Sequence, residues 1–172
     1  QPPARTGAAE AVIARHAAAY IEDGATLEFG LGVLPDSVCA ALHDRKSLKV
    51  HSGTIGDGVA DLMQRGAVGT AECAMLIGTR KLFDVAHENP SIRLRSTEFT
   101  HDTRVLASLP RFVAINSAVE IDLTGQVNAE VAKGSYLGAV GGALDFIRAA
   151  NHSPGGVSMM LLPSSRIVEK LQ

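Results

Sequence analysis

The stretch "TLEFGLGVLPDSVCAAL" (residues 26–42) decides the fold that this sequence predicts. Its first four residues are typical of a short strand. Two glycines then indicate a tight turn, and the segment after them predicts a helix at about residues 36–42. A strand that leads through a glycine-rich turn into a helix favours an α/β fold.

The same order of strand and helix occurs twice more along the chain. "LKV" (residues 48–50) predicts a strand, and residues 56–65 predict the helix after it. "CAMLIG" (residues 73–78) predicts an apolar strand that is followed by a helix over residues 79–89. Apolar strands that alternate with helices predict an open, mostly parallel sheet with helices on both faces.

The two ends of the chain extend this pattern. "QPPART" (residues 1–6) is typical of a linker, and residues 8–21 predict a helix. Near the other end, residues 141–151 predict a helix that opens with two glycines, and residues 157–163 predict a last buried strand.

Between these parts, "RFVAINSAVEIDLTGQVNAEV" predicts two strands around the turn "TGQ". Polar residues alternate with apolar ones along this segment. They form either a solvated strand face or a set of buried groups that fix loops through hydrogen bonds.

"KVHSGTIGDGVADLM" (residues 49–63) predicts the end of a strand, a polar turn and a helix. In open α/β sheets, ligands bind beyond the carboxyl ends of the strands, so this turn belongs to a site or to its surroundings. The turn carries His51, Ser52, Gly53, Thr54 and Asp57.

Three glycine-bearing segments are expected at that edge of the sheet: Gly30–Gly32, Gly53–Gly58 and Gly141–Gly142. Glycines let the backbone approach a ligand, and the N–H groups of a following helix can bind an anion or form an oxyanion hole. Each segment can also be no more than a tight connection or a helix cap.

Two side chains are candidates for acid–base or nucleophilic chemistry. Glu28 is the only acid in its strand, where it can act as a nucleophile or base, pair with an arginine or face solvent. His101 precedes Asp102, which allows a serine triad with Ser52 or Ser117, but the sequence has no G-x-S-x-G motif. The simpler alternative is that Asp102 caps a helix and His101 is partly exposed.

Composition excludes several classes of function. The net charge is −2 and aromatic residues make up only 4%, so we expect no nucleic-acid partner. The sequence contains no apolar run long enough for a membrane span, and we expect no membrane partner. Cys39 and Cys73 lie in apolar settings that predict buried reduced thiols, and no zinc-binding pattern is present. We therefore expect a cytoplasmic protein without a metal.

Taken together, five segments resemble the C-terminal domain of the acetyl-CoA hydrolase/transferase family, in the same order as in that family. This family includes acetate, succinate and 4-hydroxybutyrate CoA-transferases. The segments are "LEFGLGVLPDSV", "VHSGTIGDGVADLMQRGAV", "AINSAVEIDLTGQVNAE", "GGALDFIRAA" and "SMMLLPSSRIV".

The resemblance implies the CoA-transferase fold, which is similar to that of sugar isomerases, in two α/β domains with the active site between them. Residues 7–172 resemble the second domain, and we expect the N-terminal domain and the end of the family's chain to be absent. In the family's transferases, a glutamate attacks the acyl-CoA thioester and later carries CoA as a glutamyl thioester. The resemblance places that glutamate at Gly53, and it places an asparagine at His101.

Two functions follow as hypotheses. The chain is either the acyl-CoA-binding domain of a CoA-transferase or hydrolase for short-chain acyl-CoA thioesters, or an inactive CoA-binding or structural subunit. A third alternative is an unrelated nucleotide-sugar or sugar-phosphate isomerase on a similar sheet. It requires phosphate-binding basic side chains near the turns, where only Lys49 and Lys133 come close.

The candidate site follows from the first hypothesis. Hydrolysis without the glutamate requires another base, for which Glu28 and His101 are the candidate catalytic residues. The candidate residues for binding coenzyme A, as acyl-CoA substrate, are Gly30, Gly32, Gly53, Asn116, Gly141 and Gly142. The other expected partners are a carboxylate and either a second copy of the chain or an N-terminal domain.

Overall fold

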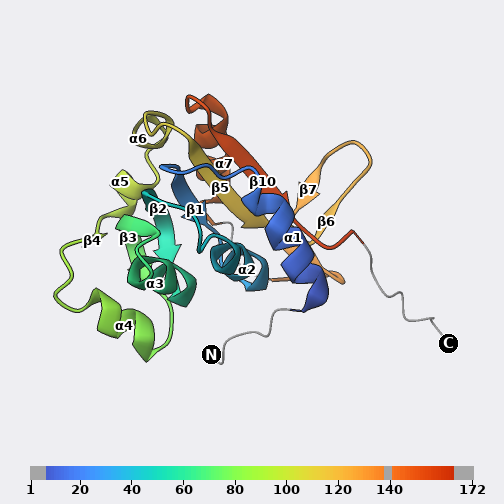
Figure 1. The fold of residues 1–172 in the computed structure, drawn as a ribbon. Coiled ribbons are helices and arrows are strands. Elements are labelled where there is room, and N and C mark those ends of the chain that lie inside the picture. Colours follow the sequence, from blue (N-terminus) through green and yellow to red (C-terminus); the bar gives the residue numbers. More distant parts are fainter. Residues whose placement is uncertain (1–6, 138–140, 165–172) are drawn as a thin grey trace.

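A computed structural model describes residues 7–137 and 141–164 of the chain (Figure 1). The predicted linker at residues 1–6 and the segment 165–172 lie outside the described residues. The helices are α1 (Ala8–Ala18), α2 (Val33–Ala41), α3 (Asp57–Gln64), α4 (Arg80–Ala86), α5 (Thr97–Thr100), α6 (Thr103–Ala107) and α7 (Ala143–His152). The strands are β1 (Thr26–Phe29), β2 (Leu48–Ile55), β3 (Val68–Leu76), β4 (Ile92–Leu94), β5 (Phe112–Ser117), β6 (Glu120–Ile121), β7 (Val127–Asn128), β8 (Val131–Ala132), β9 (Ser135–Tyr136) and β10 (Val157–Leu161).

The main sheet has six strands within the described residues, in the order β10-β5-β1-β2-β3-β4, and all its pairings are parallel. β1 lies between β5 and β2, with Leu27 opposite Val113 on one side and Val50 on the other. All four residues of β1 are buried, as expected for a strand covered on both faces. The predicted open parallel sheet is confirmed.

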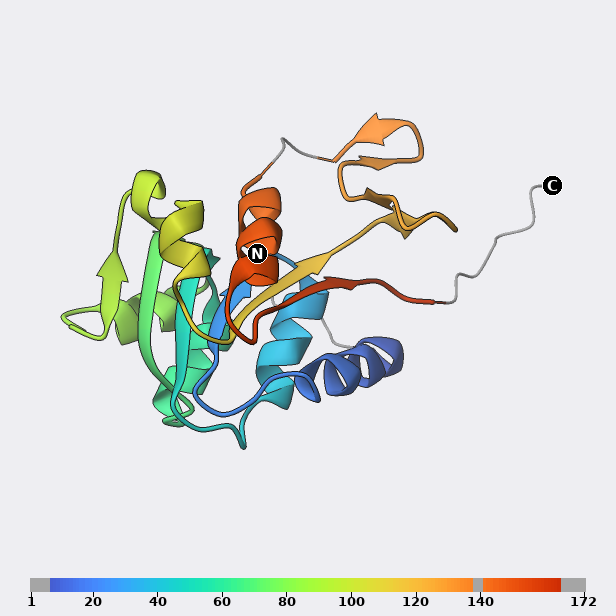
Figure 2. The same cartoon turned by 90° about the horizontal axis from the view of Figure 1, so that it is seen from above.

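Helices cover both faces of this sheet. Helices α1, α2, α3 and α4 pack against one another in series on one face, and α5, α6 and α7 lie on the other (Figure 2). Each face has its own apolar cluster: Leu27, Val50 and Ile115 belong to the larger one, whereas Leu106 and Phe146 belong to the smaller one with α6 and α7. The prediction of helices on both faces is confirmed.

The predicted polar turn after residue 50 is wrong, because β2 continues to Ile55. Residues 51–54 therefore lie within a strand, and Ser52 is paired with Cys73 of β3. A polar residue is tolerated in this buried strand because its hydrogen bonds are satisfied: the Ser52 hydroxyl lies 2.8 Å from the Thr54 carbonyl. Gly53 is accordingly a strand residue near the carboxyl end of β2.

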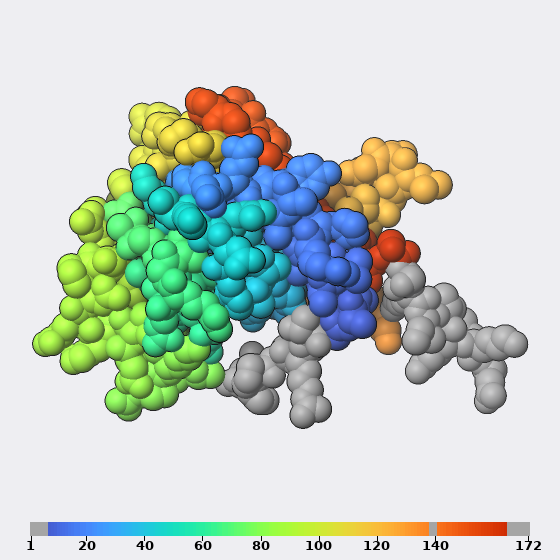
Figure 3. Space-filling model, viewed as in Figure 1, coloured from blue at the N-terminus to red at the C-terminus, as the bar shows by residue number. Residues whose placement is uncertain are grey.

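The segment around "TGQ" also departs from the prediction in part. β5 joins the main sheet, and β6 and β7 form a separate antiparallel hairpin in which Glu120 pairs with Asn128. With β8 and β9, this hairpin forms an arm (residues 118–137) that projects from the rest of the molecule (Figure 3). The hairpin itself is confirmed, but its first strand is only two residues long.

Candidate functional site

A buried carboxyl links the carboxyl ends of β1 and β5. Oε2 of Glu28 accepts hydrogen bonds from the Ile115 N–H (3.2 Å) and from Nδ2 of Asn116 (2.8 Å). Burial raises the pKa of Glu28 to about 8, although both hydrogen bonds act to lower it. The carboxyl therefore holds its proton at neutral pH.

The turn after β1 needs its two glycines for different reasons. A Cβ at Gly30 would lie 2.7 Å from Oδ1 of Asn116, so a side chain there would displace the asparagine. Gly32 has a φ of 127°, a backbone conformation that favours glycine. Glu28, Asn116 and the Gly30–Gly32 turn thus form one group at the edge of the sheet where ligands bind in α/β proteins.

A second group surrounds the imidazole of His101. A Cβ built at Gly142 would lie 2.3 Å from Cδ2 and Nε2 of His101, and one at Gly53 would lie 3.1 Å from Cε1 and Nε2. The ring also contacts Phe146 of α7, with ring centroids 4.7 Å apart. The half-buried imidazole therefore lies between β2 and the amino end of α7, in space that neither glycine fills.

The local sequence explains how the chain presents this histidine. His101 follows α5 and precedes α6, and the carboxylate of Asp102 caps α6 by accepting from the N–H groups of Arg104 (2.8 Å) and Val105 (3.4 Å). The alternative of a helix cap beside a partly exposed histidine is therefore confirmed. His101 lies between the short helices α5 and α6, and its imidazole lies beside β2.

His51 of β2 lies behind this group and is buried. Its Nε2 lies 3.2 Å from the Thr100 carbonyl, and its Nδ1 lies 3.8 Å from Oε2 of Glu72. Burial lowers the pKa of His51 even though Glu72 acts to raise it, so the ring is neutral at pH 7. A neutral His51 anchors the end of α5 by donating its Nε2–H to the Thr100 carbonyl.

Ser52 is not placed to act as a nucleophile. Its side chain is fully buried, and its hydroxyl lies between the carbonyls of Thr54 (2.8 Å) and Phe29 (3.2 Å). The hydrogen bond from Ser52 to the Phe29 carbonyl does, however, join β2 to the end of β1, the strand that carries Glu28. The structure thus gives no support to a triad built on Ser52.

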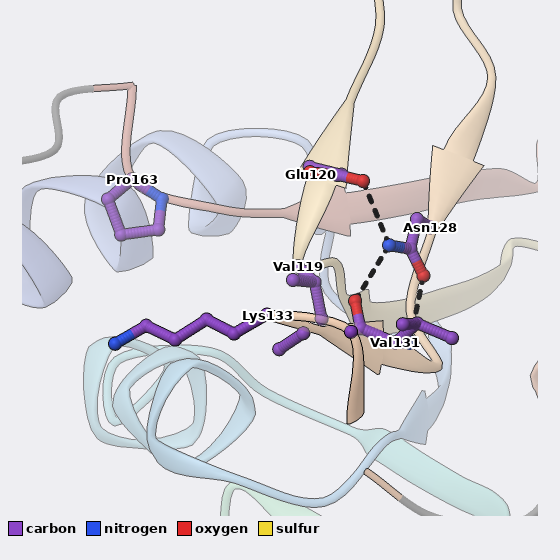
Figure 4. A pocket seen from close by; sticks show the side chains of 8 residues that line it. Val119, Glu120, Asn128, Val131, Lys133 and Pro163 are labelled. Atoms are coloured by element: carbon purple, nitrogen blue, oxygen red, sulfur yellow. Dashed lines mark hydrogen bonds between the residues drawn. The ribbon is translucent and has the colours of Figure 1, made fainter. Parts of the chain in front are cut away.

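A cavity of about 560 Å³ lies at the base of the arm (Figure 4). Asn128 forms its polar corner, where Nδ2 donates to Oε1 of Glu120 (3.0 Å) and to the Val131 carbonyl (2.8 Å). These hydrogen bonds fix the loops of this segment, as one of its two alternatives has it, but Asn128 is only half-buried and Glu120 is exposed. Lys133 and Pro163 line the cavity as well, and none of these residues belongs to the group around His101.

Comparison with known proteins identifies the family to which the chain belongs. The profile of the acetyl-CoA hydrolase/transferase C-terminal domain matches residues 78–171. The chain belongs to the acetyl-CoA hydrolase/transferase family. The predicted resemblance is confirmed.

Three similar proteins include transferases and a hydrolase. A 4-hydroxybutyrate coenzyme A transferase of Clostridium kluyveri is 38% identical over 96% of this chain and 40% of its own length. An acetyl-CoA hydrolase of Kluyveromyces lactis is 28% identical over 81% of this chain and 27% of its own length. The solved 4-hydroxybutyrate CoA-transferase of Porphyromonas gingivalis superimposes with a TM-score of 0.82 at 30% identity, covering 97% of this chain and 43% of that one. This chain therefore spans about 40% of the length of the first relative.

Most of the candidate residues of this family member fall into the two groups described above, and Gly141 lies outside both. Gly53, His101 and Gly142 are brought together, as are Glu28, Gly30 and Asn116. Gly32 ends the turn after β1, and a Cβ at Gly141 would have no described atom within 4 Å. The sequence alone did not point to Thr100 or Phe146, because a hydroxyl or apolar residue in a helix carries no local signal of chemistry.

Two further findings concern ligands and membranes. Across residues 7–137 and 141–164, no group of three or more His, Cys, Asp or Glu side chains could hold a metal ion. The same residues contain no helix that is long and apolar enough to cross a membrane. Cys39 and Cys73 are free thiols and buried, as predicted.

The position of His101 makes a prediction with a matched control. Gly142→Ala should force the imidazole to move. This should lower the free energy of unfolding by about 1–3 kcal/mol, and with it the thermal unfolding midpoint. It should also shift the ring signals of His101 in NMR spectra. Gly141→Ala places the same methyl group one residue away in open space and should change neither. Equal effects of the two substitutions would contradict the placement of the ring.

The raised pKa of Glu28 predicts a pH-dependent stability. Its carboxyl ionises near pH 4.5 when exposed and near pH 8 when folded, so stability is lost as pH rises through this window and levels off above it. Glu28→Gln removes the charge. Its free energy of unfolding should therefore rise relative to that of the wild type between pH 5 and 8, by at most about 1.4 kcal/mol per pH unit, as measured by denaturant unfolding.

The exposed Glu120→Gln serves as the control for this measurement, since it should follow the pH dependence of the wild type. A difference between Glu28→Gln and wild type that stays constant from pH 5 to 8 would show that Glu28 is already ionised.

Proposed function

We propose that this chain is the acyl-CoA-binding domain of an enzyme that hydrolyses short-chain acyl-CoA thioesters, with His101 as the base. The observation that carries the proposal is the position of the imidazole, which fills the space beside Gly53. Membership of the acetyl-CoA hydrolase/transferase family supports the class of substrate. The relatives named above include both a CoA-transferase and a hydrolase of acetyl-CoA.

The absence of a side chain at residue 53 favours hydrolysis over transfer. By the resemblance to the family, a transferase places a glutamate there to form a covalent intermediate. Glycine offers no atom for that bond. The imidazole beside it can instead remove a proton from water, which is the task of a general base.

The proposed step needs no other reactant. Nε2 of His101 takes one proton of a water molecule while the water oxygen bonds to the thioester carbonyl carbon. The C–S bond then breaks, and the thiolate of coenzyme A leaves and takes up a proton from the imidazolium. The products are a carboxylic acid and free coenzyme A, and backbone N–H groups near Gly141 and Gly142 are proposed to stabilise the developing oxyanion.

Glu28 is the second candidate for proton transfer, but its surroundings favour a supporting role. It is buried, holds its proton at neutral pH and contacts Asn116 instead of open space. We infer that it holds Asn116 in place beside Gly30. Gly30, Gly32, Gly53 and Asn116 then remain, with Gly141 and Gly142, the proposed contacts of coenzyme A.

The remaining assignments are also proposals. We propose that residues 7–172 form the second domain of a cytoplasmic two-domain enzyme, which pairs with an N-terminal domain or with a second copy of itself. The alternative function is a CoA-binding or structural subunit without turnover. The absence of a side chain at Gly53 favours that alternative if His101 proves to have no catalytic effect.

The test uses the complete natural protein that contains this chain. It is incubated with acetyl-CoA, and in parallel with propionyl-CoA and butyryl-CoA, in the presence of isotope-labelled acetate. All CoA species are followed by mass spectrometry. We expect free coenzyme A without label in the acyl-CoA pool, and we expect His101→Gln to slow its release about 100-fold.

His152→Gln is the matched control, because His152 is an exposed histidine at the other end of α7. It should leave the rate unchanged. Labelled acetyl-CoA would mean carboxylate exchange and would overturn the proposal. No turnover with any of the three thioesters would favour the inactive subunit.

A further inference from the structure

Thr100 contacts both histidines of the site. It is the last residue of α5 and is fully buried. Its carbonyl accepts from Nε2 of His51 (3.2 Å), and its Oγ1 lies 2.9 Å from Nδ1 of His101. One residue without acid–base chemistry of its own therefore connects the buried histidine to the half-buried one.

The third contact of Thr100 favours one direction for its hydrogen bonds. Oγ1 also lies 3.4 Å from the Ser96 carbonyl, one helical turn earlier. A carbonyl can only accept and a hydroxyl has a single proton, so a Thr100 hydroxyl that donates to Ser96 must accept from its other partner. Oγ1 then accepts from His101, which requires the proton of the neutral imidazole to be on Nδ1.

The surroundings of the other ring nitrogen favour the same tautomer. A Cβ built at Gly142, the residue before the first turn of α7, would lie 2.3 Å from both Nε2 and Cδ2 of His101, so Nε2 lies near the amino end of this helix. The amino end of a helix carries unpaired N–H groups and a partial positive charge. The partial positive charge at this end of the helix favours a lone pair over an N–H on Nε2.

The orientation of the ring is restricted as well. Phe146 contacts one side of the imidazole at a centroid distance of 4.7 Å, and the backbones of Gly53 and Gly142 limit its edge. The hydrogen bond from His51 holds the Thr100 carbonyl in place. Rotation of the His101 ring would therefore break the bond to Thr100 or collide with a neighbour.

We propose that Thr100 is a positioning residue, which holds His101 in the tautomer whose unprotonated Nε2 faces the gap between Gly53 and Gly142. This inference deepens the proposed function and rests on it for its catalytic consequence. A base must present a lone pair to water, and the Thr100 hydroxyl ensures that Nε2 does so. The tautomer itself is a property of the protein that can be measured without any substrate.

The experiment records the ring-nitrogen NMR spectrum of the complete protein labelled with ¹⁵N-histidine, at a pH where His101 is neutral. The signal of His101 is assigned by its loss in His101→Gln. Thr100→Val removes the hydroxyl but keeps the shape of the side chain and the carbonyl that binds His51. Thr100→Ser keeps the hydroxyl and is the conservative control.

We expect the wild type and Thr100→Ser to carry the proton on Nδ1, and Thr100→Val to shift part of the population to the Nε2–H tautomer. We expect kcat for acyl-CoA hydrolysis to fall about tenfold in Thr100→Val with KM changed less than twofold, and Thr100→Ser to stay within twofold of the wild type in both.

Two results would overturn the inference: an Nε2–H tautomer in the wild type, which is informative even if Thr100→Val fails to fold, or an unchanged tautomer in a folded Thr100→Val. If the wild type shows the expected tautomer but hydrolyses none of the three thioesters, the proposed function fails and the positioning by Thr100 stands.

Discussion

The imidazole of His101 can occupy its place because residue 142 has no Cβ, and the missing Cβ at residue 53 relieves a second close contact. A methyl group at either position would come within 3.1 Å or less of the ring. This constraint joins parts of the chain that are far apart in sequence, since β2, the α5–α6 connection and the amino end of α7 must meet around one ring. A glycine inside a strand weakens it, so the exception at Gly53 has a reason in the site.

The two groups of candidate residues differ in electrostatics as well as in position. The carboxyl of Glu28 is enclosed between β1 and β5, where burial keeps it protonated. The imidazole of His101 is half-buried and lies beside Gly53, Gly142 and the ring of Phe146. The proposed function gives them separate tasks: the buried carboxyl holds Asn116 in place, and the half-buried imidazole acts as the base. The geometry is consistent with hydrolysis and offers residue 53 no atom for covalent transfer.

Local patterns in the sequence predicted the architecture but not the contacts that form the site. The strand at residues 26–29 was predicted with the bounds it has, because an apolar run before a glycine turn has few alternatives. The polar residues and the glycine in the carboxyl half of β2 predict a turn, although this half is a strand whose buried serine is satisfied by the backbone. The approach of His101 to Gly142 spans 41 residues, from 101 to 142, and no periodicity reports it. Thr100 was missed for the same reason: its importance comes from three contacts, of which only those to Ser96 and His101 are local.

The most direct test of the account is the fate of oxygen from the solvent. The complete protein would turn over acetyl-CoA several times in H₂¹⁸O, after which the acetate and the peptides of the protein are analysed by mass spectrometry. Attack by water that His101 activates predicts one ¹⁸O atom in each acetate released and no ¹⁸O in any side-chain carboxyl group. Label in a glutamate or aspartate of the protein would contradict the account, because it would show that a carboxylate had carried the acyl group or coenzyme A.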